Sequence, residues 1–320
     1  PGFPHLYVET ATPLSTPVGE LRVGAFWGML EESDYFFSTS PRNRRILTVL
    51  HGSWSVPFLE GLDVGATAML QENVEAGLDL SYLTTIFAAS PHQSSRIDPA
   101  DGRGNVHARW RFPDPGFEVY GEWGFNDFWG SMDDFLGEPD HAQAFTVGLE
   151  RKHRSPTDAS GWRLIGEMVS LKVSRPRWLG YRVVDPLSTS FYAHDGVRPG
   201  HTHRGRLLGA YVGPGSDAQF LAFERWTPGA RWSAFLERVR WNDDSYYRHF
   251  GEEYGFHAHD IEWTIGGSLG RPVGPVLAGV QAGLSRRKNR HFLGLDGVNW
   301  DFVREWNVWV DVDVAWRPEV

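Results

Sequence analysis

The densest group of residues able to do chemistry lies in the segment Gly121–His141, which is rich in carboxylates and aromatic rings. A pair of carboxylates can hydrolyse a glycosidic bond. Carboxylate and amide oxygens can also bind Ca²⁺, although the spacing does not match an EF-hand loop. A third chemistry is sugar binding, with hydrogen bonds to hydroxyls and stacking on aromatic faces, and a solvated acidic loop without function is the alternative. The polar candidates are Glu122, Asn126, Asp127, Asp133, Asp134, Glu138, Asp140 and His141, and the aromatic ones are Trp123, Phe125, Phe128 and Trp129.

Histidines form a second group, with 13 in the chain. His201 and His203 are one residue apart, as are His257 and His259, so each pair would share a strand face. No third ligand follows at a spacing typical of zinc sites. We therefore expect histidines that line a polar interior or lie in loops, and no bound metal.

A basic cluster ends one apolar segment of the chain. Its members are Arg286, Arg287, Lys288, Arg290 and His291. A cluster of this kind can contact anionic lipopolysaccharide or an acidic polysaccharide, and it is also typical of a solvated turn.

Motifs for nucleophilic catalysis and for nucleotide binding are absent from the sequence. No serine lies in a G-x-S-x-G turn, and no P-loop or G-x-G-x-x-G opens a helix. We expect a protein that is not an enzyme and that needs no cofactor.

The elements that position these residues are predicted to be strands. Between Trp306 and Trp316 one parity is wholly apolar and the other is mostly polar or small, so a strand would place the two sets on opposite faces. Tryptophan at both ends of the apolar face is typical of a lipid-facing strand that meets two membrane interfaces. About ten alternating residues is the length needed to cross a bilayer as a tilted strand. The apolar parity is Trp306, Val308, Val310, Val312, Val314 and Trp316.

The alternation recurs along the chain, with turns rich in Gly, Pro and Asp between the segments. No segment has the period of a long amphipathic helix. The sequence therefore predicts an all-β fold, a transmembrane antiparallel β-barrel of roughly 14–18 strands. Clear segments are 62–70, 105–112, 117–125, 145–149, 261–265 and 276–284, and weaker ones are 21–27, Arg45–Trp54, Trp162–Leu171, Arg206–Gly213, Phe220–Trp226 and Arg231–Trp241.

The connections between these segments differ in length. Outer-membrane barrels alternate short periplasmic turns with longer extracellular loops. We expect Pro113–Gly116, Thr227–Gly229 and Gly270–Gly274 at the periplasmic rim. The longer connections would lie outside the cell; they are Gln71–Arg103, Asn126–Asp140, Ser174–His203 and Asn242–His257.

Composition agrees with an exported bacterial barrel. The chain has no cysteine, 15 Trp, 20 Phe and 36 Gly among 320 residues, and a net charge of −9. The negative charge argues against a nucleic-acid surface. A barrel needs no disulfide, because its strands satisfy the backbone of their neighbours.

Three phrases resemble the Wzi family of outer-membrane capsule-assembly proteins: Val119–Lys152, Arg204–Phe223 with its GPGS turn, and Gly19–Phe36. The resemblance implies a monomeric barrel in the bacterial outer membrane that acts as a surface lectin, holds capsular polysaccharide and does no catalysis. Family members are longer and begin with an N-terminal region that does not precede Pro1. We expect a single outer-membrane β-barrel domain over residues 1–320 that lacks that segment or represents a shortened branch.

Local chemistry, and not the resemblance, selects the expected binding residues at the extracellular mouth. The expected partners are capsular or other surface polysaccharide, and outer-membrane lipid with lipopolysaccharide. Two alternatives stay open: a diffusion channel or substrate-specific porin lined by the polar parity, and a soluble all-β protein that binds or hydrolyses glycans. The expected polysaccharide-binding residues are Glu122, Trp123, Asn126, Asp127, Trp129, Asp133, Asp134 and His141.

Overall fold

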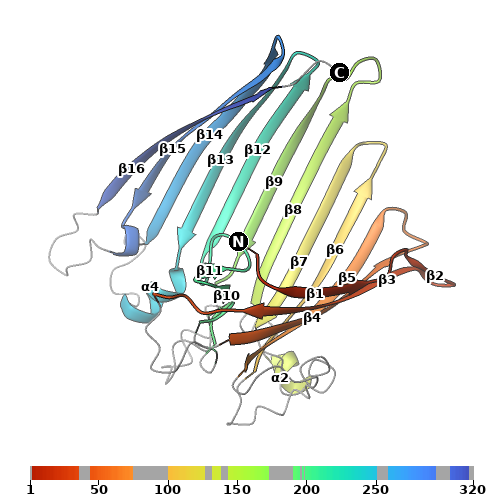
Figure 1. Cartoon of the computed structure of the whole chain (residues 1–320), viewed down its shortest axis with the longest axis vertical. Helices are drawn as coiled ribbons and strands as arrows, with labels where there is room; N and C mark the ends of the chain where they lie inside the picture. Colours follow the sequence, from red (N-terminus) through yellow and green to blue (C-terminus); the bar gives the residue numbers. More distant parts are fainter. Residues whose placement is uncertain are drawn as a thin grey trace. The chain divides into compact units, whose positions relative to one another are not determined.

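The computed structural model describes residues 2–35, 44–74, 100–126, 132–137, 143–172, 190–194, 197, 199–250, 259–292 and 303–316. Most of these residues lie in β-strands (Figure 1). The strands of the main sheet are β1 (His5–Glu9), β2 (Leu14–Thr16), β3 (Gly19–Leu30), β4 (Arg44–Ser55), β5 (Leu62–Val74), β6 (Asp101–Phe112), β7 (Phe117–Asn126), β8 (Gln143–Arg154), β9 (Gly161–Ser170), β12 (Asp217–Thr227), β13 (Ala230–Trp241), β14 (Asp260–Val273), β15 (Val276–Lys288) and β16 (Arg304–Trp316).

These 14 strands form one sheet in the order β1-β3-β4-β5-β6-β7-β8-β9-β12-β13-β14-β15-β16, with β2 paired to β3. Neighbouring strands, such as β14 and β15, are antiparallel. The remaining strands, β10 (Thr202–His203) and β11 (Arg206–Leu207), pair only with each other. The predicted all-β antiparallel fold class is confirmed.

Short helices occupy some of the connections between strands. They are α2 (Met132–Gly137), α4 (Asp243–Phe250) and the 3-10 turn η3 (Arg290–Phe292). Among the described residues, no helix is long and apolar enough to cross a membrane.

Connection lengths alternate, as the sequence predicts. Short turns at residues 56–61, 113–116, 155–160, 228–229 and 274–275 alternate with long connections at 31–43, 75–100, 127–142, 171–216, 242–259 and 289–303. Because successive strands are antiparallel, each strand has one end at a short turn and the other at a long connection. We call these the short-turn end and the long-connection end.

Several boundaries differ from the predicted ones, and two of them change a turn or a strand. β14 continues to Val273, so the predicted turn Gly270–Gly274 is shifted to residues 274–275, where Gly274 has a φ of 58°. A two-residue hairpin turn needs such a left-handed position, which glycine adopts without strain. The predicted strand Arg206–Gly213 is wrong beyond Leu207, because the chain turns there and Gly213 has a φ of 73°.

The two faces of the sheet differ as the alternation predicts. In β16 the side chains of the apolar parity are 63–70% exposed, from Trp306 to Trp316. Leu284 of β15, Ile265 of β14 and Leu236 of β13 lie on the same face and are also exposed. An exposed apolar face this extensive is typical of a surface that contacts lipid or another protein.

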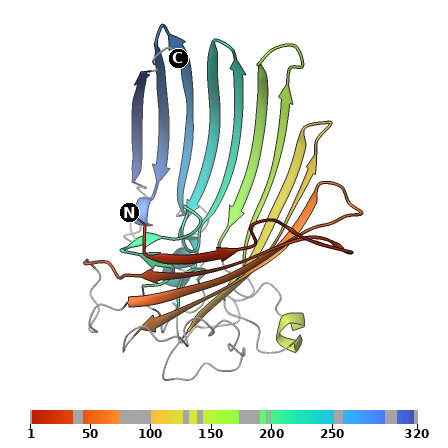
Figure 2. The ribbon, with the colours of Figure 1, turned by 45° about the vertical axis from the view of Figure 1, so that its right-hand side comes forward.

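The contacts divide the chain into two compact units, which are described separately. The first comprises Pro1–Arg109, Gly121–Phe145 and Leu171–Gly215; the second comprises Trp110–Tyr120, Thr146–Ser170 and Ser216–Val320. In the first unit β1, β3, β4 and β5 run side by side (Figure 2, red to orange). In the second unit β12 to β16 do the same (Figure 1, cyan to dark blue).

Each unit has its own small core near the long-connection end of its strands. In the first unit the core includes Leu30, Leu47, Phe191, Val197 and Val212. In the second it includes Val169, Ala218, Val239 and Tyr246. Buried polar side chains, such as those of Arg45 and Asp260, lie beside both cores.

Candidate functional site

The predicted polysaccharide-binding residues begin on strand β7. Glu122 and Trp123 are neighbours in a strand and therefore point to opposite faces. Glu122 shares the polar parity with Asn126, whereas the indole N–H of Trp123 donates to the side chain of Gln143 (3.0 Å) from the other face. The structure thus separates Trp123 from Glu122 and Asn126.

The other predicted residues follow β7. Asp133 and Asp134 belong to α2, where the side chain of Asp133 is exposed. Asp127, Trp129 and His141 lie outside the described residues. The acidic-loop site therefore stays a prediction.

Asn126 has a structural role in the first unit. Its side-chain oxygen accepts a hydrogen bond from Nε of Arg103 (2.7 Å), and its amide donates to the backbone oxygen of Ala193 (3.3 Å). Arg103 also pairs with Asp101, and all three polar side chains are buried. Buried polar groups need such partners, because an unpaired one costs a few kcal/mol, about 1–3. Asn126 therefore joins the end of β7 to the segment around Ala193.

A second buried arginine holds the segment Pro199–Gly213, which we call the covering segment. Nη1 of Arg45 donates to the backbone oxygen of Gly200 (2.6 Å), and Nη2 donates to that of Thr202 (2.9 Å). Nε2 of Gln71 donates to the same Gly200 oxygen (3.0 Å). Arg45 and Gln71 are completely buried, so the covering segment packs over the polar face of β4 and β5.

The predicted histidine pair lies in the covering segment. The ring of His201 is buried and stacks on Tyr192 at a centroid distance of 5.5 Å. Burial, followed by the charge of Arg103, lowers the pKa of His201 to about 3, and burial also lowers the pKa of His203. Nδ1 of His203 accepts a hydrogen bond from the backbone of Glu31 (3.1 Å). Both rings are thus interior groups, as expected, and His257 of the second pair lies outside the described residues.

Beside the covering segment is a polar pocket of about 600 Å³ at the long-connection end of β3 and β4. Its volume falls in the range of small-molecule sites, roughly 300–1,000 Å³. Tyr35 is 93% exposed, so its ring is available for stacking. The lining residues are Glu31, Glu32, Ser33, Asp34, Tyr35, Arg44 and Arg204.

One wall of the pocket is fixed by contacts between Glu31 and Arg204. The Arg204 guanidinium donates through Nε to the Glu31 carboxylate (2.7 Å), and the Arg204 backbone N–H donates to the Glu31 carbonyl (2.8 Å). The hydrogen bond from Arg204 holds the pKa of Glu31 below its usual value. At the next residue, Gly205 has a φ of +75°, and a Cβ there would lie 3.2 Å from Ser33. The pocket thus presents carboxylates, guanidinium groups, a hydroxyl and an aromatic ring on a fixed support.

This pocket was not among the predicted sites. A signal for it exists in the sequence, because the run LEESDY follows an alternating strand and ends the Gly19–Phe36 phrase that resembles the Wzi family. Its other wall, at Arg204, is 173 residues away from Glu31 and could not be placed beside it without the fold.

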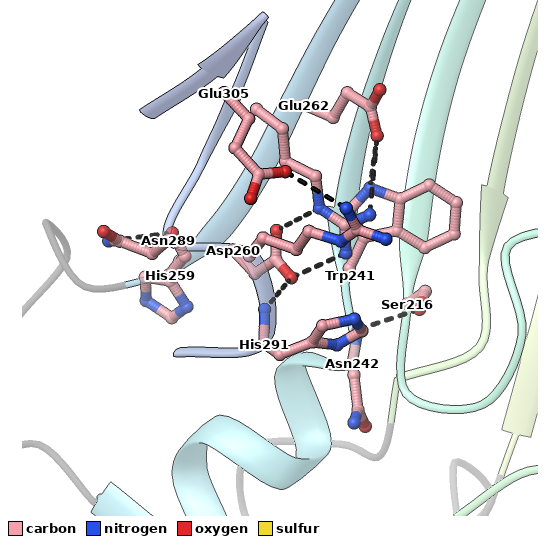
Figure 3. Close-up of polar contacts among 11 residues, drawn as sticks. Ser216, Trp241, Asn242, His259, Asp260, Glu262, Asn289, His291 and Glu305 are labelled. Carbon is pink, nitrogen blue, oxygen red and sulfur yellow. Dashed lines mark hydrogen bonds and ion pairs between the residues drawn. The ribbon is translucent and has the colours of Figure 1, made fainter. Parts of the chain in front are cut away.

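The second unit contains a separate polar cluster (Figure 3). The Asp260 carboxylate accepts two hydrogen bonds from Arg287, at 2.8 and 2.7 Å, and a third from the backbone of His291 (2.9 Å). The Arg287 guanidinium lies over the Trp241 ring at 4.9 Å, and the Trp241 indole donates to Glu262 (3.0 Å). Bidentate arginine–carboxylate pairs are among the strongest polar contacts in proteins. The cluster joins the long-connection ends of β13, β14 and β15.

The same cluster extends to α4 through Asp243. Nδ1 of His259 lies 2.5 Å from its carboxylate, and Nη1 of Arg240 donates to it at 3.0 Å. The Tyr246 ring packs on that of His259 at 4.1 Å. Among the described residues, no group of three or more His, Cys, Asp or Glu could hold a metal ion.

Comparison with known proteins gives a likeness of fold. No family model matches the chain, and no curated protein matches it. Its structure is similar to that of Wzi from Escherichia coli, an outer membrane protein involved in group 1 capsule assembly and described as a carbohydrate-binding β-barrel, with a TM-score of 0.60 and 16% identity. The chain has the fold of Wzi. The alignment covers 98% of this chain and 59% of Wzi.

A second similar structure is that of BamA from Haemophilus ducreyi lacking POTRA domains 1–3, with a TM-score of 0.42 and 12% identity. The alignment with BamA covers 97% of this chain and 62% of the BamA chain. The Wzi-like fold that three short phrases indicated is thus confirmed by the likeness to Wzi.

Proposed function

We propose that this chain is an outer-membrane β-barrel protein that binds and anchors exported capsular polysaccharide at the cell surface without catalysis. Residues 1–320 would form a single barrel domain and act as a monomer. The observation that carries the proposal is the polar pocket at the long-connection end of β3 and β4, in a chain that has the fold of a protein described as carbohydrate-binding.

The placement in the outer membrane is supported by the exposed apolar face. The parity Trp306–Trp316 is exposed along its whole length and begins and ends with tryptophan. A soluble protein would hide or interrupt such a face, whereas a lipid-facing strand requires it. The long connections, and the pocket with them, would then lie on the extracellular side.

The chemistry of the pocket suits a carbohydrate. Sugar hydroxyls donate hydrogen bonds to carboxylates and accept them from guanidinium groups, and both are present at Glu31, Asp34 and Arg44. The ring of Tyr35 offers an apolar face to the C–H groups of a sugar. Fixing Glu31 through Arg204 before ligand arrives reduces the entropy lost on binding.

The polar parity favours a protein that fixes its interior charges over a diffusion channel. Asp260 and Glu262, which lie on the polar parity, contact Arg287, and Arg103 contacts Asp101. The charged side chains that line a conducting lumen face water and passing ions, whereas these side chains form ion pairs with one another.

The pocket is tested by replacing Tyr35 with alanine. Loss of one aromatic stacking partner is worth roughly 0.5–1.5 kcal/mol, so the affinity should fall about threefold to tenfold. The purified chain in detergent micelles is tested against immobilised bacterial capsular polysaccharides by biolayer interferometry. Phe58→Ala is the matched control, because Phe58 is a 75% exposed aromatic residue at the short-turn end. Binding by Tyr35→Ala as strong as that by wild type would refute the assignment of the pocket.

The acidic loop is proposed as a second contact to the same polysaccharide. Asp133 is exposed in α2, where a ligand can reach its carboxylate. The double variant Trp129→Ala with Asp134→Ala should lower capsule retention without lowering the amount of folded protein. Unchanged retention would remove this loop from the site.

A further inference from the structure

A group of cations lies on the apolar face of β15 and β16, at the long-connection end. The register pairs Lys288 with Arg304 and Arg286 with Trp306. Arg304 and Trp306 share the parity of Val308 to Trp316, so Arg286, Lys288 and Arg304 lie on the exposed apolar face. We call these three residues the outer cations.

Alternation divides the basic cluster that the sequence groups together. Arg287 lies on the polar face and binds Asp260, and Arg290 pairs with Glu305 (3.2 Å). Arg286 and Lys288 point the other way and are joined by Arg304 from the adjacent strand. Arg287 and Arg290 are thus paired with carboxylates, whereas Arg286 and Lys288 lie on the apolar face of the sheet.

The outward parity of β14, β15 and β16 supplies no carboxylate. Asp260, Glu262 and Glu305 all alternate with outward residues and lie on the polar face. On β13, by contrast, the outward Arg238 is paired with Asp217 (2.9 Å), and Arg240 is paired with Asp243. At the long-connection end, the outward face of β14 to β16 therefore carries an excess of positive charge, at the outer cations.

The outer cations lie next to an aromatic belt. Trp263 and Trp306 flank Arg286 in one row across the strands, and the Arg286 guanidinium lies over the Trp306 ring at 5.3 Å. Lys288 and Arg304 are in the next row toward the long connections, and on the other side the residues that β15 and β16 contribute to this face are apolar down to Trp316. Tryptophan belts mark the level of lipid headgroups. The outer cations would therefore lie at the headgroup level of the leaflet on the long-connection side.

We propose that Arg286, Lys288 and Arg304 bind the phosphate groups of lipid A, the phosphorylated glycolipid of the outer leaflet. This inference rests on the outer-membrane placement proposed above and not on the polysaccharide pocket. Guanidinium groups bind phosphate oxygens through two parallel hydrogen bonds, and a lysine adds a point charge. The lipid chains would lie along the valine stripe of β16, where Val308, Val310 and Val312 are exposed.

The test uses the full chain in detergent micelles and two probes: bis-phosphorylated lipid A and the same lipid after removal of both phosphates. Native mass spectrometry counts the bound lipids. Each cation near an anionic lipid surface contributes about a factor of five, so Arg286→Gln with Lys288→Gln and Arg304→Gln should lower the affinity for lipid A on the order of a hundredfold. High salt should weaken wild-type binding in the same direction.

Arg271→Gln is the matched control, because Arg271 is exposed on the same face of β14 but lies beside Ala278 at the short-turn end. The single variant Arg304→Gln should give an intermediate loss and serves if the triple variant does not fold. Equal binding of both lipids by wild type, or equal losses in the Arg271 and triple variants, would overturn the proposal.

The same variants separate this surface from the polysaccharide site. The triple variant should bind capsular polysaccharide as wild type does, and Tyr35→Ala should bind lipid A as wild type does. Loss of polysaccharide binding, but not of lipid A binding, in the triple variant would assign the outer cations to the polysaccharide and refute the lipid site.

Discussion

Replacing Arg45 with methionine should release the covering segment from the sheet. Arg45 is completely buried, and its guanidinium donates to the carbonyls of Gly200 at 2.6 Å and Thr202 at 2.9 Å. A hydrogen bond from a charged donor is worth roughly 1.5–3 kcal/mol, so two contribute about 3–6 kcal/mol. Removing the buried charge also removes its desolvation cost, which offsets part of the loss. We expect a net loss of about 2–3 kcal/mol in the free energy of local opening, because Gln71 still holds the Gly200 carbonyl.

Hydrogen exchange measures this opening directly. The backbone N–H groups of His201, Arg204 and Leu208 donate to carbonyls and report on the covering segment. A loss of about 2–3 kcal/mol corresponds to exchange roughly 30-fold to 160-fold faster at these amides. Arg22→Met is the control, since Arg22 is exposed in β3. Unchanged exchange in Arg45→Met, or an equal increase in Arg22→Met, would refute the docking role of Arg45.

Two further changes test the interior contacts. The pKa of His201 is about 3 when folded and near 6.5 when unfolded, so the stability due to its neutral ring is complete above pH 6.5 and is lost as the pH falls toward 3. From pH 6.5 to 5 the loss is about 2 kcal/mol, and it should lower the denaturation midpoint of wild type relative to that of His201→Gln. Parallel pH profiles of the two proteins would contradict this prediction. Asp260→Asn removes the bidentate partner of Arg287 and should lower the free energy of unfolding by about 3 kcal/mol, measured by thermal unfolding in detergent. Glu305→Gln, at an exposed pair, should lower it by less than about 1 kcal/mol. Equal losses in the two variants would show that burial of the Asp260 pair has no effect.

The strands could be predicted because their alternation is regular and their apolar side is exposed. In Trp306–Trp316 every second residue is apolar from end to end, and the structure contains this segment as β16. Alternation does not determine where a strand ends, because a strand continues for as long as its neighbour offers backbone partners, as β14 does to Val273. Residues 208–213 look apolar enough for a strand, but the pairing of β11 ends at Leu207, and the Ala210 backbone N–H donates to the hydroxyl of Tyr192 and not to a strand.

The candidate site was harder to predict, since it depends on residues that are distant in the sequence. The pocket needs both Glu31 and Arg204, which only the docking of the covering segment brings together. The separation of Trp123 from Glu122, by contrast, follows from strand alternation and was available from the sequence. The basic cluster near Arg287 shows the same rule, because its adjacent members face opposite environments.

Polysaccharide retention on cells tests the central claim most directly. Capsule-producing cells that lack this protein would carry wild type, Tyr35→Ala or Phe58→Ala at equal outer-membrane levels, and cell-bound and released polysaccharide would be measured separately. We predict that wild type and Phe58→Ala keep the polysaccharide on the cells, whereas Tyr35→Ala releases a larger share into the medium. Equal retention by cells with wild type and by cells without the protein would contradict the proposed function.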